Sequence, residues 1–210
     1  MFAAAATLIA KHGYAGASLR MIADELGASA PSLSQMFSSK QRLLVELVAH
    51  LADVSIRFHE RLEGLALPPA VRLHKMVREE VMAVSSANGS LMAIFYLPEL
   101  RQPDFRDAQQ ARARMIGFYR DVIGAGVHQG IFRSVNPGVA AEQVFQLTET
   151  SIVALERAAL GRPAELAEQS AEFVLRGLLA DSGALAGIVR ASAAVDLAMM
   201  TAAGVSHNYP

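Results

Sequence analysis

The sequence predicts an all-α protein, and three observations support this fold class. Alanine, which has the highest intrinsic helix propensity, is the commonest of the 210 residues. Apolar residues recur at spacings of three and four, and no stretch shows the strict polar-apolar alternation of a strand. The 8 prolines fall between the periodic stretches rather than within them. We therefore expect helices that are separated by breaks at proline and glycine.

The first expected helix extends to about Lys11 and ends at the turn around Gly13. Ser18 is placed to cap the second helix, because its hydroxyl can accept a hydrogen bond from a free backbone N–H. Four apolar residues of this second helix follow at i, i+3, i+4 and i+7 and predict one buried face: Leu19, Ile22, Ala23 and Leu26. Gly27 is expected to end the helix.

Ser29 is the expected cap of a third helix, and Pro31 suits its first turn because the missing N–H is not needed there. Leu33 and Phe37 are four residues apart and should face inward. Three polar side chains would then face outward: Ser32, Ser34 and Gln35. Two short helices joined at a glycine describe a helix-turn-helix. An ordinary helical hairpin without DNA-binding function would show the same spacing.

The order of specific residues goes beyond this spacing. Gly13-Tyr14, Ile22-Ala23, the turn Gly27-Ala28-Ser29 and the approach Phe37-Ser38-Ser39-Lys40 to a long helix follow one another within residues 5–44. This stretch resembles the N-terminal domain of the TetR family of transcriptional regulators. The resemblance implies a homodimeric helical repressor whose N-terminal domains enter the major groove of DNA, and whose C-terminal domain binds a small molecule that releases the DNA.

The resemblance also implies which residues contact DNA. The helix after Ser29 corresponds to the recognition helix, where Ser32, Ser34 and Gln35 would face the bases, and glutamine can pair with adenine. Ser18, Ser29 and Lys40 lie at helix N-termini, and Ser18 and Lys40 match family positions that contact phosphate. The family usually has a tyrosine at the position of Ser34 and histidines after it, so the resemblance does not specify the operator sequence.

The charge of this segment is low for a DNA-binding domain. Residues 1–50 carry four Lys and Arg against three Asp and Glu, and the whole chain has a formal net charge of -1. Contacts to phosphate dominate affinity for DNA, so we expect weaker DNA binding than is usual in the family.

The remaining chain predicts a helical bundle. Helices are expected over residues 40–65, 70–86, 103–129, 136–160 and 163–180, with an additional C-terminal helix or tail over 183–210. The corresponding division is a helix-turn-helix domain at residues 1–45 and a ligand-binding and dimerisation domain at 46–182.

In the TetR family the helices of the second domain surround an effector cavity. The side chains on the corresponding helices here are mostly apolar: Phe58, Met92, Phe95, Met115, Phe118, Tyr119, Leu147 and Ser151. A small-molecule site is typically apolar with a few polar groups, so an apolar or amphipathic effector is the hypothesis. The alternative for each of these residues is simple core packing.

The last two helices of the family pair with those of a second subunit. Small or apolar faces that suit close helix approach are found here at Ala154, Ala158, Ala171, Leu175 and Leu178. The alternative is that these faces pack only within the subunit.

Composition and motifs exclude other functions. Hydrophobic residues make up 52% of the chain and charged residues 19%, which excludes a disordered chain, and the absence of cysteine excludes thiolate metal sites. The 6 histidines form no pair at metal-ligand spacing. No nucleophile elbow or phosphate loop appears, so we expect neither an enzyme nor a cofactor. No signal peptide is apparent, and Arg190 and Asp196 interrupt the alanine-rich segment at 184–203, so a cytoplasmic protein is expected.

Two hypotheses about function remain. The first is a TetR-like dimeric repressor that binds a palindromic operator and is released by a small effector. The alternative is a helical small-molecule-binding protein with weak or lost operator binding.

Overall fold

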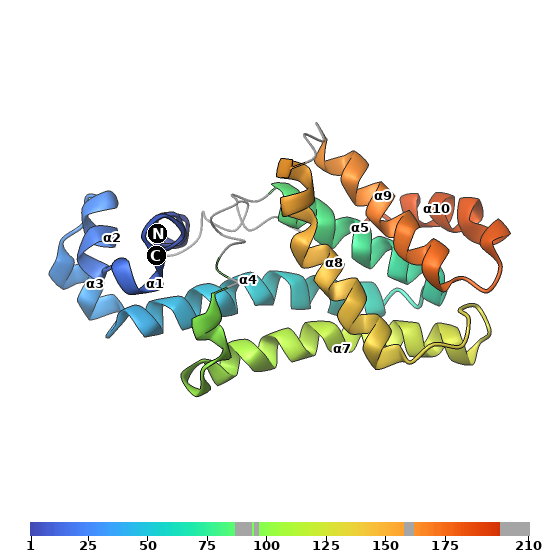
Figure 1. Cartoon of the computed structure of the whole chain (residues 1–210), viewed down its shortest axis with the longest axis horizontal. Helices are drawn as coiled ribbons and strands as arrows, with labels where there is room; N and C mark the ends of the chain where they lie inside the picture. Colours follow the sequence, from blue (N-terminus) through green and yellow to red (C-terminus); the bar gives the residue numbers. More distant parts are fainter. Residues whose placement is uncertain (87–93, 95–96, 158–161, 198–210) are drawn as a thin grey trace. The chain divides into compact units, whose positions relative to one another are not determined.

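The computed structural model describes residues 1–86, 94, 97–157 and 162–197, with side chains omitted at 84–86 and 152–157. In these residues the fold is all-α, as predicted (Figure 1). Its elements in chain order are α1 (Phe2–Gly16), α2 (Leu19–Glu25), α3 (Ala30–Met36), α4 (Lys40–Glu63), α5 (Pro69–Ser86), the short 3-10 turns η2 (Pro98–Arg101) and η3 (Pro103–Phe105), α7 (Arg106–His128), α8 (Pro137–Arg157), α9 (Pro163–Leu178), η4 (Ser182–Ala184) and α10 (Leu185–Ala193).

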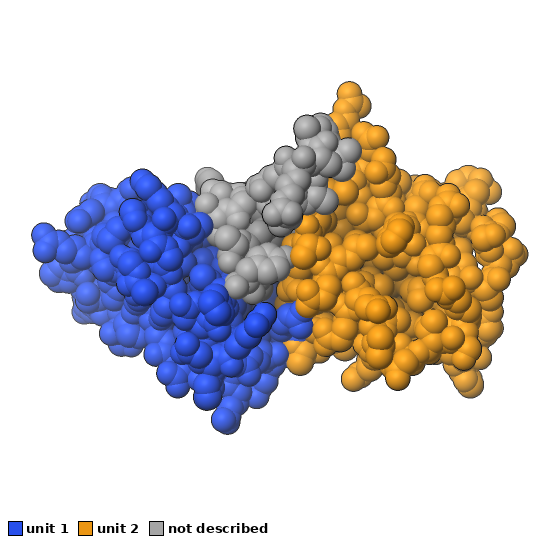
Figure 2. Space-filling model, viewed as in Figure 1, with its two compact units in different colours: residues 1–53, 87–112 blue, residues 54–86, 113–210 orange. Residues whose placement is uncertain are grey.

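The chain divides into two compact units (Figure 2). The first unit contains residues 1–53 and 87–112, and the second contains residues 54–86 and 113–210. This division differs from the expected boundary at residue 45, because the first half of α4 belongs to the first unit together with the later segment 87–112.

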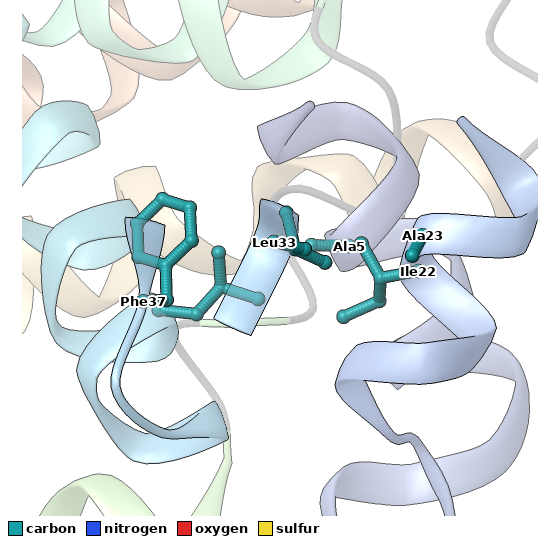
Figure 3. Packing of buried hydrophobic residues seen from close by; sticks show 6 residues of the cluster. Ala5, Ile22, Ala23, Leu33 and Phe37 are labelled. Atoms are coloured by element: carbon teal, nitrogen blue, oxygen red, sulfur yellow. The ribbon is translucent and has the colours of Figure 1, made fainter. Parts of the chain in front are cut away.

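The core of the first unit joins the first three helices to the start of α4. Six buried side chains form it: Ala5 from α1, Ile22 and Ala23 from α2, Leu33 from α3, Phe37 after α3 and Leu43 from α4 (Figure 3). Ile22, Ala23, Leu33 and Phe37 are therefore inward-facing, as predicted. Leu26 is not, because α2 ends at Glu25 and leaves Leu26 as its C-terminal cap, 37% exposed.

Glycine sets two of the breaks that the sequence predicts. Gly13 interrupts α1 with φ +70°, but helical structure continues beyond it to Gly16, five residues past the expected end. Gly27 follows α2 with φ +64°, which allows the turn into α3. Both values lie in the region that favours glycine, because other residues place a Cβ against the backbone there.

In the second unit α5 packs mainly against α9, α8 and α10. Three buried residues of α5 face this core: Leu73, Met76 and Val77. The predicted C-terminal helix is present as α10, and His74 Nδ1 of α5 lies 2.9 Å from the Ser192 hydroxyl of α10. Burial lowers the pKa of His74, which favours the neutral ring. None of the described helices is long and apolar enough to cross a membrane.

The turn after α7 depends on close packing against Gly126. The backbone N–H groups of Ile131 and Phe132 donate to the Gly126 carbonyl at 2.9 Å and 3.0 Å, and the buried Phe132 ring covers the glycine. A Cβ on Gly126 would lie only 2.1 Å from Phe132 Cδ2. Backbone bonds from Arg133 to the Leu178 carbonyl and from Ala180 to the Ile131 carbonyl then attach this turn to the end of α9.

We expect Gly126→Ala to destabilise the protein by about 1–3 kcal/mol, because the added methyl group must displace a buried ring. Gly124→Ala in the same helix is the matched control, since its Cβ would meet Pro137 at 3.9 Å, an ordinary contact. The control should be neutral or gain up to about 1 kcal/mol of helix stability. Thermal and chemical unfolding measure both variants, and equal behaviour of the two would contradict this packing.

Candidate nucleic-acid interface and ligand site

The two short helices α2 and α3 are each capped by a serine. The Ser18 hydroxyl accepts a hydrogen bond from Met21 N at 3.2 Å, and the Ser29 hydroxyl accepts one from Ser32 N at 3.2 Å. Each helix has only seven residues, a length at which the free N–H groups of the first turn are a large share of all backbone groups. The caps that the sequence predicts are therefore part of what defines the helix-turn-helix.

The outward face of α3 is polar and uncharged. Ser32, Ser34 and Gln35 are exposed, and Met36 beside them is 61% exposed, whereas Leu33 is buried. The Ser32 hydroxyl also lies 2.7 Å from the Ser29 hydroxyl, so it contributes to the start of the helix. Side chains of this kind can hydrogen-bond to base edges or contact a thymine methyl group, but none of them can neutralise a phosphate.

Lys40 holds the end of α1. Its ammonium group donates to the carbonyl oxygens of Tyr14, Ala15 at 3.2 Å and Ala17 at 2.8 Å, and Nζ lies 4.5 Å from the centroid of the Tyr14 ring. These carbonyls lie where α1 ends, so the cation satisfies backbone groups that no further turn of helix would satisfy. The phosphate contact predicted for Lys40 stays a prediction, and a phosphate would have to compete with these acceptors.

Lys40→Met keeps the aliphatic stem but leaves the three carbonyls without their charged donor. We expect the first unit to lose roughly 1–3 kcal/mol of stability, measured as a lower unfolding temperature. Lys11→Met, at an exposed position of α1, is the matched control and should change stability by less than about 0.5 kcal/mol. If Lys40→Met were as stable as the parent and only DNA affinity fell, Lys40 would be a phosphate contact rather than a structural residue.

The predicted ligand residues in the second unit lie on three helices. Phe58 belongs to α4, Met115, Phe118 and Tyr119 to α7, and Leu147 and Ser151 to α8. Phe58, Met115, Tyr119 and Ser151 are buried, whereas Phe118 and Leu147 are partly exposed. Met92 and Phe95 lie outside the described residues. The role of all eight in ligand binding stays a prediction.

A buried histidine lies at the centre of the aromatic residues of this unit. The His59 ring centroid is 5.3 Å from that of Phe58, 5.2 Å from Phe118 and 5.5 Å from Tyr119, and the Tyr119 ring in turn contacts Phe145 at 6.0 Å. Aromatic pairs at these separations attract one another beyond simple burial.

A carboxylate from α5 joins the same histidine. Glu80 Oε1 lies 2.8 Å from His59 Nε2 and also accepts a hydrogen bond from the Ser55 hydroxyl. All three side chains are buried. They were not among the residues predicted from the sequence, although Ser55 and His59 are four apart on α4, which places them on the same side of this helix.

The predicted dimer residues on α9 face the interior of their own unit. Ala171 and Leu175 are fully buried and Leu178 is 7% exposed, so these three leave almost no surface for a second subunit. The apolar stripe of α9 thus fills the core of its own unit, and the role predicted for these residues at a dimer interface stays a prediction. The side chain of Ala154 and the whole of Ala158 lie outside the description. On the opposite side of α9, Phe173 is 69% exposed.

No group of three or more metal-binding side chains occurs in the described part of the chain. His74 is buried between Ser192 and Glu168, with its Nε2 3.3 Å from the Glu168 carboxylate. This histidine contributes to helix packing, because its two contacts join α5 to α10 and to α9.

Comparison with known proteins supports the resemblance of the N-terminal segment to the TetR family. The family model described as "Bacterial regulatory proteins, tetR family" matches residues 2–47, which contain α1, α2, α3 and the start of α4. Residues 2–47 therefore match this family, and the fold of the described residues is that of a TetR-family transcriptional regulator. A comparison with curated proteins finds no match.

Solved structures share the fold over most of the chain. AmtR of Mycobacterium smegmatis is 29% identical, with 93% of each chain covered and a TM-score of 0.72. A TetR-family regulatory protein from Rhodococcus RHA1 is 21% identical, covering 86% of this chain and 96% of that one, with a TM-score of 0.75. AibR, in complex with isovaleryl coenzyme A and operator DNA, is 20% identical, covering 85% and 95%, with a TM-score of 0.70.

Proposed function

We propose that the protein is a dimeric repressor that binds a palindromic operator and is released from it by a small apolar or amphipathic effector. The observation that carries this proposal is the capped helix-turn-helix within residues 2–47, the segment that the family model matches. AibR, which has a similar fold, is known in complex with both a small molecule and operator DNA. The proposed protein is cytoplasmic and non-enzymatic.

The side chains on the outward face of α3 support the proposal that this helix hydrogen-bonds to DNA bases. Gln35 is exposed on this helix and can form a bidentate pair with adenine in the major groove, while Ser32 and Ser34 can donate to or accept from either partner. Ser18 and Ser29 place two helix N-termini in the same unit, where backbone N–H groups suit phosphate oxygens. A symmetric dimer would bring two such heads to half-sites about 34–36 Å apart or a multiple of this distance.

The proposed effector site is the aromatic region of α4, α7 and α8 in the second unit. Its described side chains are mostly apolar, and the buried polar exceptions on these helices are Ser55, His59, Tyr119, Thr148 and Ser151. This composition suits a molecule with a large apolar part and few polar groups. Effector binding there would move α4, which continues into the first unit, and so change the spacing of the two heads.

The low charge of the first unit favours a second candidate, a helical small-molecule-binding protein with weak or lost operator binding. Residues 1–50 have a net charge of only +1, and the Lys40 ammonium donates hydrogen bonds to backbone carbonyls of its own unit. Gel-shift titration with DNA from the flanks of its own gene, at several salt concentrations, separates the two. The repressor shows sequence preference and an affinity that falls with salt, by a logarithmic slope of about -0.9 for each phosphate contacted.

Gln35→Ala tests the base contact. We expect the variant's preference for adenine over other bases at one base pair to fall roughly tenfold or more, because a bidentate pair to adenine is lost. This corresponds to about 1–3 kcal/mol of discrimination. Affinity for random DNA should change little. Gln129→Ala, an exposed glutamine of the second unit, is the control and should behave like the parent in the same gel-shift titration. Equal weakening by Gln35→Ala on all sequences would contradict the assignment.

Phe173 is the proposed anchor of the dimer. It is 69% exposed on α9, and Glu172 and Arg176 beside it are joined by an ion pair of 2.9 Å, so a polar rim borders an aromatic centre. Its position on the outer side of α9 means that it can contact a second subunit without disturbing the buried face of the helix.

Phe173→Arg should therefore convert a dimer into a monomer of 22.4 kDa without unfolding it, because the substitution places a charge at the centre of the interface. Light scattering after size-exclusion chromatography measures the mass. Leu65→Arg, at another exposed apolar residue, is the matched control and should remain dimeric. A monomeric parent protein, or a dimeric Phe173→Arg variant, would show that this surface is not the interface.

A further inference from the structure

The second unit contains a buried polar cluster, Ser55, His59, Glu80 and Tyr119, whose hydrogen bonds are incomplete. Glu80 Oε1 accepts from the Ser55 hydroxyl and lies 2.8 Å from His59 Nε2. His59 is 1% exposed and Tyr119 is fully buried. Yet His59 Nδ1 and the Tyr119 hydroxyl have no hydrogen-bond partner among the residues that the structure describes. A polar atom in such a position costs about 1–3 kcal/mol, so two together in one cluster call for an explanation.

The contact with Glu80 determines whether the second ring nitrogen of His59 donates or accepts a hydrogen bond. A carboxylate only accepts hydrogen bonds, so Nε2 carries the hydrogen that points to Glu80. In the neutral ring Nδ1 is then left with a lone pair and acts as an acceptor. For the neutral ring, the group that completes this site therefore has to donate a hydrogen bond.

The Tyr119 hydroxyl, by contrast, is a hydrogen-bond donor. Burial, with a smaller contribution from the Glu80 carboxylate, raises the pKa of Tyr119 well above its usual range, so the phenol keeps its hydrogen and can donate it. Thr148 is the side chain that approaches the phenol, but the two do not reach hydrogen-bond geometry, and the Thr148 hydroxyl itself donates to the Phe145 carbonyl at 2.8 Å. The phenol remains available to an acceptor.

The two unpartnered atoms belong to adjacent rings. The His59 and Tyr119 centroids are 5.5 Å apart with an interplanar angle of 72°. The rings of Phe58 and Phe118 contact His59, and the ring of Phe145 contacts Tyr119. The donor and the acceptor thus belong to neighbouring rings within an aromatic surrounding. A hydroxyl group can satisfy both, because it has one hydrogen to donate and lone pairs to accept.

We propose that His59 and Tyr119 bind the hydroxyl group of a neutral aromatic or alicyclic alcohol, whose O–H donates to His59 Nδ1 and whose oxygen accepts from the Tyr119 hydroxyl. This proposal rests on the proposed function, and it specifies the chemical class of the effector. The buried Glu80 carboxylate disfavours an anionic ligand, because two negative charges in a poorly solvated site repel each other strongly. The apolar part of the ligand packs against the phenylalanine rings.

Binding of three matched probes tests the ligand class: 2-naphthol, naphthalene and 2-naphthoate, which share a ring system and differ in the polar group. The chain has no tryptophan, so the fluorescence of the bound probe can be followed without that background. We expect 2-naphthol to bind about tenfold more tightly than naphthalene, and 2-naphthoate to bind most weakly. Phenol and cyclohexanol extend the series to smaller alcohols, and failure of all three alcohols to bind would overturn the proposal.

Tyr119→Phe tests the role of the phenol, because it removes one hydroxyl and keeps the ring. Affinity for 2-naphthol should fall about tenfold while affinity for naphthalene stays unchanged. Tyr14→Phe, in the first unit, is the matched control and should bind all probes like the parent. If Tyr119→Phe raises the unfolding temperature but leaves 2-naphthol binding unchanged, the phenol is only an unsatisfied core group and the proposal is wrong.

The gel-shift titration separates this proposal from the proposed function. Tight binding of 2-naphthol without any effect on DNA binding would support the alcohol site and contradict its role as an effector site. DNA that is bound specifically and released by 2-naphthoate but by no alcohol would support the repressor and overturn the alcohol site.

Discussion

The backbone groups at the ends of short helices need hydrogen-bond partners, and the first unit depends on three side chains that supply them. Ser18 and Ser29 satisfy N–H groups at the starts of α2 and α3, and the Lys40 ammonium satisfies carbonyls at the end of α1. Helices of seven residues are too short to be stable on their own. With their ends satisfied, they can bury Ile22, Ala23 and Leu33 in one core, and the outward face of α3 is fixed as a result.

This use of side chains has a consequence for the proposed DNA binding. Lys40 is one of only four Lys and Arg in residues 1–50, and its charge is directed at the protein's own backbone. The face of α3 contributes no charge either. Under the proposal, recognition therefore depends more on contacts to bases than is usual, and affinity depends on the second head of a dimer.

Local features were predictable from the sequence, and features that join distant residues were not. The caps at Ser18 and Ser29 and the breaks at Gly13 and Gly27 follow from the chemistry of single residues, so they were predicted correctly. The Glu80 contact with His59 joins residues 21 apart on two helices, and no spacing rule reveals it. The stripe of Ala171, Leu175 and Leu178 shows the limit most clearly, because an apolar face looks the same whether it packs within a subunit or between two.

Under the proposed function, the capped α3 helices of a dimer contact bases in a symmetric operator. Selection of bound sequences from a pool of random double-stranded DNA tests it most directly. We expect enrichment of an inverted repeat whose half-sites are centred about 10–10.5 base pairs apart, or a multiple of this. Each half-site should contain an adenine that Gln35→Ala no longer enriches. A pool that shows no enriched sequence after selection, or one enriched only in a single unrepeated site, would contradict it.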